Sequence, residues 1–166
     1  AKAELGVHCG SIEFHSDRQL IQFPLDVALL SKTSNHKVST QRSEEEGKEV
    51  IKVTNDLLEF KASAEFAGCL FFLSGKDKVN QLCSNFPHIG TKVFLQNYSG
   101  GIRALHLGED FDFGKSKSHL ESFQAEIVRE ERWNGAKFSF KSEKQEEMKG
   151  LLGSISYLTL PSSNIV

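Results

Sequence analysis

The sequence is poor in proline, tryptophan and tyrosine, and it has no long hydrophobic run. Its 166 residues include 3 Pro, 1 Trp and 2 Tyr, against 13 Phe. No apolar run approaches the roughly 20 residues that a membrane-spanning helix needs. The formal net charge is −2, whereas nucleic-acid binders carry a concentrated basic face. The sequence therefore predicts neither a membrane nor a nucleic acid as partner.

The cysteines do not have the number or the spacing of a disulfide framework or a zinc site. There are three, Cys9, Cys69 and Cys83, and an odd number does not make a complete set of disulfides. No Cys-x-x-Cys pair exists, and no histidine lies at zinc-finger spacing from a cysteine pair. No His, Asp and Glu cluster has metal-ligand spacing. We expect reduced thiols, at least one of which is a candidate for reactivity, and no metal site.

Short alternating stretches predominate, which is typical of β-strands. The most apolar stretch, residues 66–73, predicts a strand that is buried on both faces. Residues 119–132 fit either a helix or a strand. The Asn134-Gly135 pair after them predicts a hairpin turn, and with the alternating residues 137–141 it favours the strand. The other predicted strands are residues 9–15, 20–30, 49–53 with a continuation at 57–61, 92–97, 102–107, 111–113, 137–141 and 154–160.

One segment predicts a helix. Ser142 and Gln145 have the spacing of a capping box at the start of residues 142–152. Residues 31–47 are polar and predict a loop. We therefore expect one domain over residues 1–166, of the α+β class and mainly β: a β-sandwich of mixed strands with one or two flanking helices.

Cys69 is the first candidate for chemistry. Ala67 and Gly68 precede it, and small residues allow a tight turn and the close approach of a substrate backbone. Backbone N–H groups at such a turn can point at a developing oxyanion. The alternative is a core residue, because unpaired cysteine is among the most buried residue types.

His88 is the second candidate. It lies between Pro87, which restricts the backbone, and Gly90, which frees it. A histidine at the start of one strand can face a cysteine at the start of a neighbouring strand, and such a pair activates a thiol nucleophile. The alternative is a histidine in a surface loop.

The elements Ala67-Gly68-Cys69 and His88-Ile89-Gly90-Thr91 resemble the catalytic core of the cytotoxic necrotizing factor and Burkholderia lethal factor family of bacterial glutamine deamidase toxins. Members of that family open one strand with Gly-Cys and the next with His, on a β-sandwich with flanking helices. The resemblance covers residues 63–91. It implies Cys69 as nucleophile, His88 as acid and base, the N–H groups of Gly68 and Cys69 at the oxyanion, and Ser63 as the third group.

The resemblance implies a toxin or secreted effector that converts a glutamine of a host protein to glutamate, with transglutamination as a possible side activity. The implied substrates are a Rho-type GTPase or a translation-initiation helicase, reached by secretion or translocation into the host cell cytoplasm. No cofactor or metal is needed. Two alternatives share parts of the pattern: a non-catalytic β-sandwich binding module of a larger secreted assembly, and a cysteine protease or acyltransferase.

Overall fold

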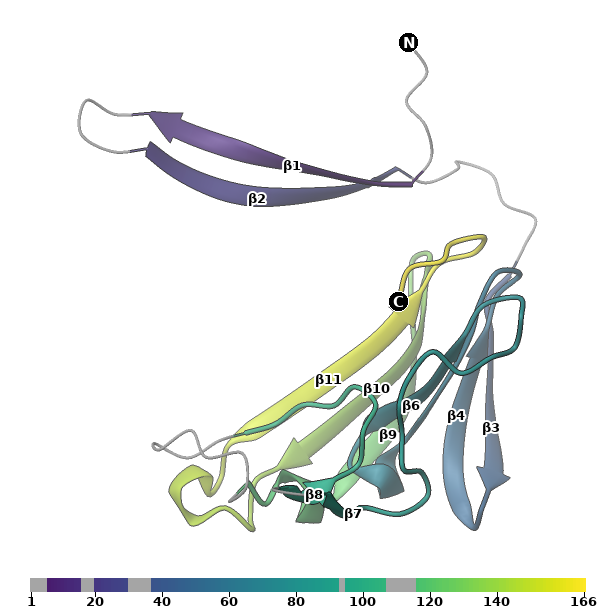
Figure 1. Ribbon diagram of the computed structural model, residues 1–166, viewed down its shortest axis with the longest axis vertical. Coiled ribbons are helices and arrows are strands. Elements are labelled where there is room, and N and C mark those ends of the chain that lie inside the picture. The colour runs from purple at the N-terminus through teal and green to yellow at the C-terminus, as the bar shows by residue number, and fades with distance from the viewer. Residues whose placement is uncertain (1–5, 16–19, 30–36, 93–94, 107–115) are drawn as a thin grey trace. The chain divides into compact units, whose positions relative to one another are not determined.

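The computed structural model describes residues 6–15, 20–29, 37–92, 95–106 and 116–166 (Figure 1). The chain divides into two compact units, Ala1–Asn35 and His36–Val166. The single domain predicted over residues 1–166 stays a prediction. Among the described residues, no helix combines the length and the apolar character that crossing a bilayer requires.

The first unit contains an antiparallel pair of strands, β1 (Gly6–His15) and β2 (Leu20–Leu29). The strands predicted at residues 9–15 and 20–30 are thus confirmed. Pro24 lies opposite Ser11 in this ribbon. A proline has no N–H to donate to a strand ladder, so it is tolerated in a two-stranded ribbon, where each strand has an outer edge.

The second unit contains two antiparallel sheets and a hairpin (Figure 1). The four-stranded sheet has the order β3 (Ser39–Glu45), β4 (Lys48–Thr54), β5 (Glu59–Ser63) and β6 (Cys69–Ser74). The three-stranded sheet has the order β11 (Leu152–Thr159), β10 (Trp133–Lys141) and β9 (Phe123–Glu130). The hairpin pairs β7 (Gly90–Lys92) with β8 (Leu95–Tyr98).

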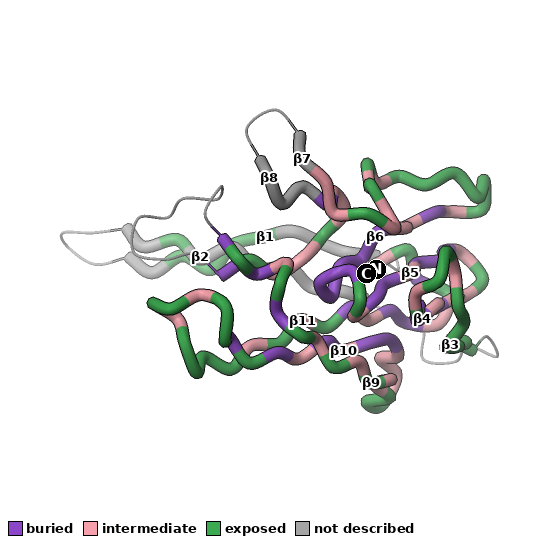
Figure 2. Tube along the Cα trace, turned by 90° about the horizontal axis from the view of Figure 1, so that it is seen from below, coloured by how far each residue is buried: buried purple, intermediate pink, exposed green. Residues whose placement is uncertain are grey.

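The two sheets of the second unit share one hydrophobic core, which Figure 2 shows as buried positions along the strands of both sheets. Phe60 from β5 and Phe138 from β10 are fully buried in it, and the Phe138 ring lies 5.9 Å from that of Tyr157. The mainly β, two-sheet architecture is therefore confirmed. The buried members of this core are Ile51, Val53, Leu58, Phe60, Ala62, Leu70, Ala136, Phe138 and Tyr157.

Strand β6 contributes to both faces of its sheet, as its apolar run predicts. A register shift opposite Lys61 and Ala62 leaves Phe71 as an extra residue, which is a β-bulge. Leu70 packs in the core between the sheets, whereas Cys69 packs on the other face. That second group, here called the outer cluster, consists of Val50, Phe66, Cys69 and Phe71, with Phe72, Phe86 and Ile89 packed against it.

The free side of β6 is covered by a side chain and by a second segment. The Asn80 amide accepts a hydrogen bond from the Leu73 N–H at 3.0 Å and donates one to the Phe71 carbonyl at 3.1 Å. Leu70 and Ile102 exchange backbone hydrogen bonds of 2.8 and 2.9 Å. The backbone groups that β6 directs away from β5 are thus satisfied without a further strand.

The predicted helices are wrong for the described residues, which contain only three short 3-10 turns. In residues 142–152 the chain forms the turn Glu146–Met148 and then enters β11. The capping-box side chains have other partners: the Ser142 hydroxyl donates to Glu121, and the Gln145 amide oxygen accepts from the Lys117 N–H at 3.0 Å. The prediction of mixed strands is also wrong, because the pairs are antiparallel throughout the part of the chain that is described.

Several strand predictions need correction. Residues 39–45, predicted as loop, form β3. Residues 119–132, which fit either a helix or a strand, contain β9, so the strand is confirmed there. The described residues of 92–97 divide between β7 and β8. Of residues 102–107, the described residues 102–106 make only an isolated bridge at Ile102, and residue 107 and residues 111–113 lie outside the described part. The hairpin that follows β9 turns at Glu131 and Arg132, so that Asn134 and Gly135 lie within β10.

Candidate functional site

Cys69 begins β6 directly after a tight backbone turn. Ala67 and Gly68 have φ angles of 60° and 62°, so the chain reverses between the 3-10 turn Ala64–Phe66 and the strand. A Cβ at Gly68 would lie 2.7 Å from the Phe123 ring, which restricts the position to glycine. The tight turn that the sequence indicates before Cys69 is therefore present.

The Cys69 thiol is enclosed by backbone. Its Sγ lies 3.3 Å from the Gly100 carbonyl oxygen and 3.5 Å from that of Leu70, and its side chain has no exposed surface. Burial raises the pKa of the thiol to about 12, against the opposing influence of the Arg103 charge. Nucleophilic attack requires the thiolate, whereas the raised pKa favours the neutral thiol at neutral pH.

Ser63 lies opposite Cys69 in the register of β5 and β6. Its hydroxyl is buried and donates a hydrogen bond of 2.6 Å to the Glu49 carbonyl oxygen on β4. The structure therefore brings Ser63 beside Cys69 in the sheet, but it directs the Ser63 hydroxyl to the backbone of a different strand.

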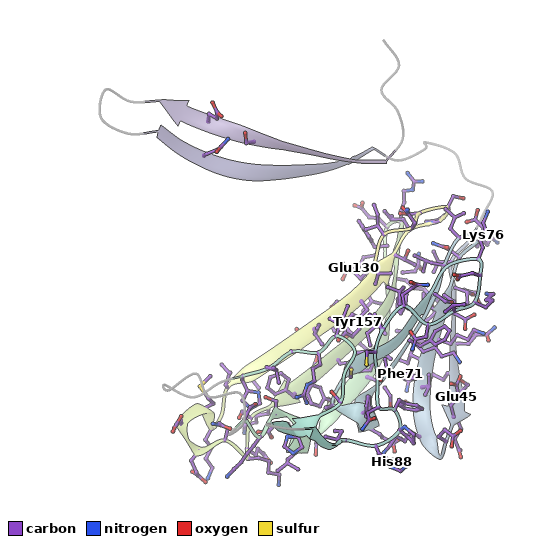
Figure 3. All side chains as sticks on the ribbon, in the orientation of Figure 1. Glu45, Phe71, Lys76, His88, Glu130 and Tyr157 are labelled. Carbon is purple, nitrogen blue, oxygen red and sulfur yellow. The ribbon has the colours of Figure 1, made fainter. Side chains whose placement is uncertain are left out.

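His88 belongs to a segment that reaches the outer cluster through other side chains. Phe86 stacks on Phe71 with ring centroids 3.8 Å apart, and Ile89 packs against the same cluster. His88 itself is exposed, and Figure 3 places it toward one end of the second unit, with Phe71 between it and Tyr157 in this view. Within the described residues, no hydrogen bond joins the His88 side chain to Cys69.

At the predicted oxyanion position, the backbone N–H and carbonyl of Gly68 are both in use. The Gly68 N–H donates to the Ala64 carbonyl at 3.4 Å. The Tyr157 hydroxyl lies 3.0 Å from the Gly68 carbonyl oxygen and 2.7 Å from that of Ile102, and burial raises the pKa of Tyr157. Gly68 thus supports the contact between the two sheets, and its N–H points into a turn rather than toward solvent.

Sequence reasoning missed a buried polar cluster formed by His106, Glu121 and Ser142. The Ser142 hydroxyl lies 3.0 Å from Glu121 Oε1 and 3.3 Å from His106 Nε2, and all three side chains are almost completely buried. The backbone N–H groups of Glu143 and Lys144 donate to the same carboxylate at 2.9 Å. No motif marks these residues, because they come from three separate segments.

The electrostatics of the cluster keep His106 neutral and Glu121 charged. Burial lowers the pKa of His106, although the Glu121 charge acts in the opposite direction. Burial alone would raise the pKa of Glu121, but its backbone and Ser142 hydrogen bonds outweigh burial and lower it. Burial and the Arg103 charge also lower the pKa of His119.

The cluster does not have the geometry of a hydrolytic triad. In such a triad, serine and carboxylate bind opposite ring nitrogens of the histidine. Here Ser142 and Glu121 both lie at His106 Nε2, whereas Nδ1 has no hydrogen-bond partner among the residues that the structure describes. The buried Ser142 hydroxyl also cannot meet a substrate. The cluster therefore fixes the segment that begins at Ser142.

Acid should weaken the second unit because of these shifts. A histidine whose pKa is lowered by folding binds more protons when unfolded, so its contribution to stability is complete above its ordinary pKa of 6.5 and is lost as the pH falls below it. We expect the Tm to fall by about 5 °C between pH 7.5 and 5.5. The Tm of wild type and H106N across this range tests the assignment.

The decline should shrink in H106N and persist in H88N, which alters an exposed histidine. Because the pKa of His119 is lowered as well, part of the decline should remain in H106N. An identical decline in wild type and H106N would contradict a proton-linked role for His106.

A groove lies beside this cluster, at one end of the three-stranded sheet. Its volume is about 310 Å³. Phe140 and Glu121 form its buried side, while exposed polar side chains form its rim. The lining residues are Glu121, Ser122, Gln124, Ser139, Phe140, Lys141, Glu143, Lys144 and Leu152.

Comparisons with protein-family models, with curated proteins and with solved structures found no match to this chain. Across the described residues, no group of three or more His, Cys, Asp and Glu side chains is placed to hold a metal ion. The function must therefore be inferred from the geometry of the two sheets, from the state of Cys69 and from the groove.

Proposed function

We propose that this chain is a non-catalytic β-sandwich binding module. The observation that carries the proposal is the state of Cys69, whose buried thiol has a pKa raised to about 12. The sulfur contacts backbone carbonyls, and the exposed His88 makes no hydrogen bond to it among the described residues. These features support a structural role for Cys69 in the core. A core residue is the alternative to a nucleophile that its position in an apolar strand suggests.

The surface of the second unit supports a binding role. The two sheets bury one face each in a shared core, which leaves the opposite face of the three-stranded sheet exposed at alternate positions. The groove at the end of this face has a volume of about 310 Å³, near the lower end of the range of ligand pockets, which begins at roughly 300 Å³. A rigid sheet with a groove can bind a ligand without a nucleophile.

Glutamine deamidation is the second candidate function. What favours it is that Ser63 is the register partner of Cys69 and that Phe86 and Ile89, which flank His88, pack on the cluster that contains Cys69. Under this proposal the Cys69 thiolate attacks the carboxamide of a host protein, His88 protonates the departing ammonia, and water then hydrolyses the thioester. It requires a rearrangement that exposes Cys69 and turns His88 inward.

The rate of iodoacetamide labelling separates the two functions. In a C9S background, we expect native Cys69 to label about 100-fold more slowly than the exposed Cys83, because labelling must await opening of the core. The difference should disappear in denaturant. Single-cysteine variants that keep either Cys69 or Cys83 provide the matched control.

H88A should leave the labelling of Cys69 unchanged. Rapid labelling of Cys69 with an apparent pKa below about 8, slowed by H88A, would contradict the binding module and indicate a paired nucleophile. Mass spectrometry of candidate host proteins would then show whether a glutamine side chain becomes glutamate.

A further inference from the structure

We propose that the groove at the end of the three-stranded sheet binds an acidic carbohydrate, a chain of hexuronic acid units. The inference rests on the proposed binding function and names the class of ligand. It depends on three features of the groove: a row of hydroxyl and amide groups, two lysines on its rim, and one leucine that is left in water.

The first feature is a row of polar side chains across the three strands. Ser139 on β10 and Gln124 on β9 line the groove and lie opposite one another, and Ser154 on β11, outside the lining, continues the row from Ser139. Residues that are directly opposite one another share a face of the sheet, at the strand spacing of about 4.8 Å. Serine hydroxyls and glutamine amides both donate and accept hydrogen bonds. Sugar hydroxyls do the same, so a row of this kind complements a sugar chain.

The second feature is positive charge on the rim of the groove. Lys141 and Lys144 are both exposed, and among the described residues neither forms an ion pair. By contrast, Lys137 on the same face lies 3.3 Å from the Glu126 carboxylate. The two rim lysines therefore have ammonium groups available for the carboxylates of a ligand.

The two acidic residues of the groove differ in how far they offset the positive charge of its rim. The carboxylate of Glu121 is buried and accepts hydrogen bonds from the Ser142 hydroxyl and from two backbone N–H groups. Glu143 is the exposed carboxylate in the lining. The lining thus has two exposed lysines, Lys141 and Lys144, for this single exposed acid, so the rim favours a ligand with spaced negative charges over a neutral one.

The third feature is Leu152, whose relative exposed surface is 75%. It lies opposite Lys141 in the register of β10 and β11 and lines the groove. Contact with the apolar C–H face of a sugar ring would remove this leucine from water, which is favourable in proportion to the apolar area buried.

The groove is also held in shape before any ligand arrives. Its wall at residues 143 and 144 is bound through backbone N–H groups to the Glu121 carboxylate. The Lys117 N–H donates to the Gln145 amide oxygen and fixes the next residue of the same segment. A preformed groove loses little conformational entropy on binding, which favours affinity.

The test is a calorimetric titration of the full chain with oligogalacturonate. We expect binding that K141A and K144A each weaken by about tenfold at low salt, and that L152S weakens by about fivefold. K137A is the matched control, because its lysine lies on the same face but is paired with Glu126. Its Kd should stay within about twofold of wild type.

Three outcomes would overturn the proposal. Equal affinity for a neutral galactose oligomer would remove the role of the lysines, and equal affinity for polyglutamate would show that the groove recognises acidic polymers of any kind. Absence of binding to oligogalacturonate would reject the ligand class. If Cys69 stays protected while oligogalacturonate fails to bind, only this inference fails, whereas rapid labelling of Cys69 overturns the binding module whatever the groove binds.

Discussion

Replacement of Phe138 by alanine is expected to lower the free energy of unfolding of the second unit by about 3–5 kcal/mol. Phe138 has no exposed surface, lies on the central strand β10, and packs in the core that joins the two sheets. Its removal leaves a cavity against side chains from both sheets. Urea denaturation followed by the fluorescence of Trp133, the single tryptophan, measures the change.

Ser156 provides the control for this substitution. It lies on the neighbouring strand β11 and is exposed, so S156A should change the free energy of unfolding by less than about 0.5 kcal/mol. A loss below about 1 kcal/mol for F138A would contradict a tightly packed contact between the sheets.

The second large effect is expected at Asn55, which joins the turn between β4 and β5 to the end of the chain. Its amide nitrogen donates hydrogen bonds to Thr159, Leu160 and Ser163, at 3.2, 2.8 and 2.8 Å. N55D replaces this donor with a carboxylate oxygen that faces three acceptors. We expect a loss of about 3 kcal/mol at pH 7, because buried groups without partners cost about 1–3 kcal/mol each.

The loss in N55D should become smaller in acid. Repulsion from the three oxygens raises the pKa of the new carboxyl in the folded state, so the penalty applies while the group is charged and diminishes as the pH falls through that raised pKa. The difference in stability between wild type and N55D, measured by urea denaturation at several pH values, tests this sign. N134D is the control, because the Asn134 amide makes a single hydrogen bond to a backbone carbonyl. An equal loss in both variants would contradict the joining role of Asn55.

The strands that the sequence predicts well are those whose own residues alternate between apolar and polar. Residues 49–53 and 154–160 alternate in hydrophobicity and form β4 and β11. Strand β3 was missed because its sequence, STQRSEE, has no apolar residue and its conformation depends on pairing with β4. The helix at 142–152 was wrong for a related reason: Ser142 satisfies a buried carboxylate far along the chain instead of a helix end.

Prediction of the candidate site is limited in the same way, by contacts between segments that are far apart in the sequence. The sequence indicates a tight turn before Cys69, and the segment around His88 does lie against the outer cluster. Which side chain of that segment points inward was not predictable, because it follows from the packing of Phe86 on Phe71. Gly135 is a similar case, since a Cβ there would lie 1.9 Å from the Tyr157 carbonyl oxygen. Glycine at this position therefore allows the close approach of β11 and does not form the predicted turn.

The amide of Asn80 also bears on how the molecule behaves in concentrated solution. An open strand edge is a template on which a second chain can polymerise. At β6 the Phe71 carbonyl and the Leu73 N–H are occupied by the Asn80 side chain, and Leu70 is occupied by Ile102. Because an amide side chain presents no further edge, the four-stranded sheet cannot be extended there into a fibril. Protection against aggregation at this edge thus depends on the Asn80 side chain together with the backbone of Ile102.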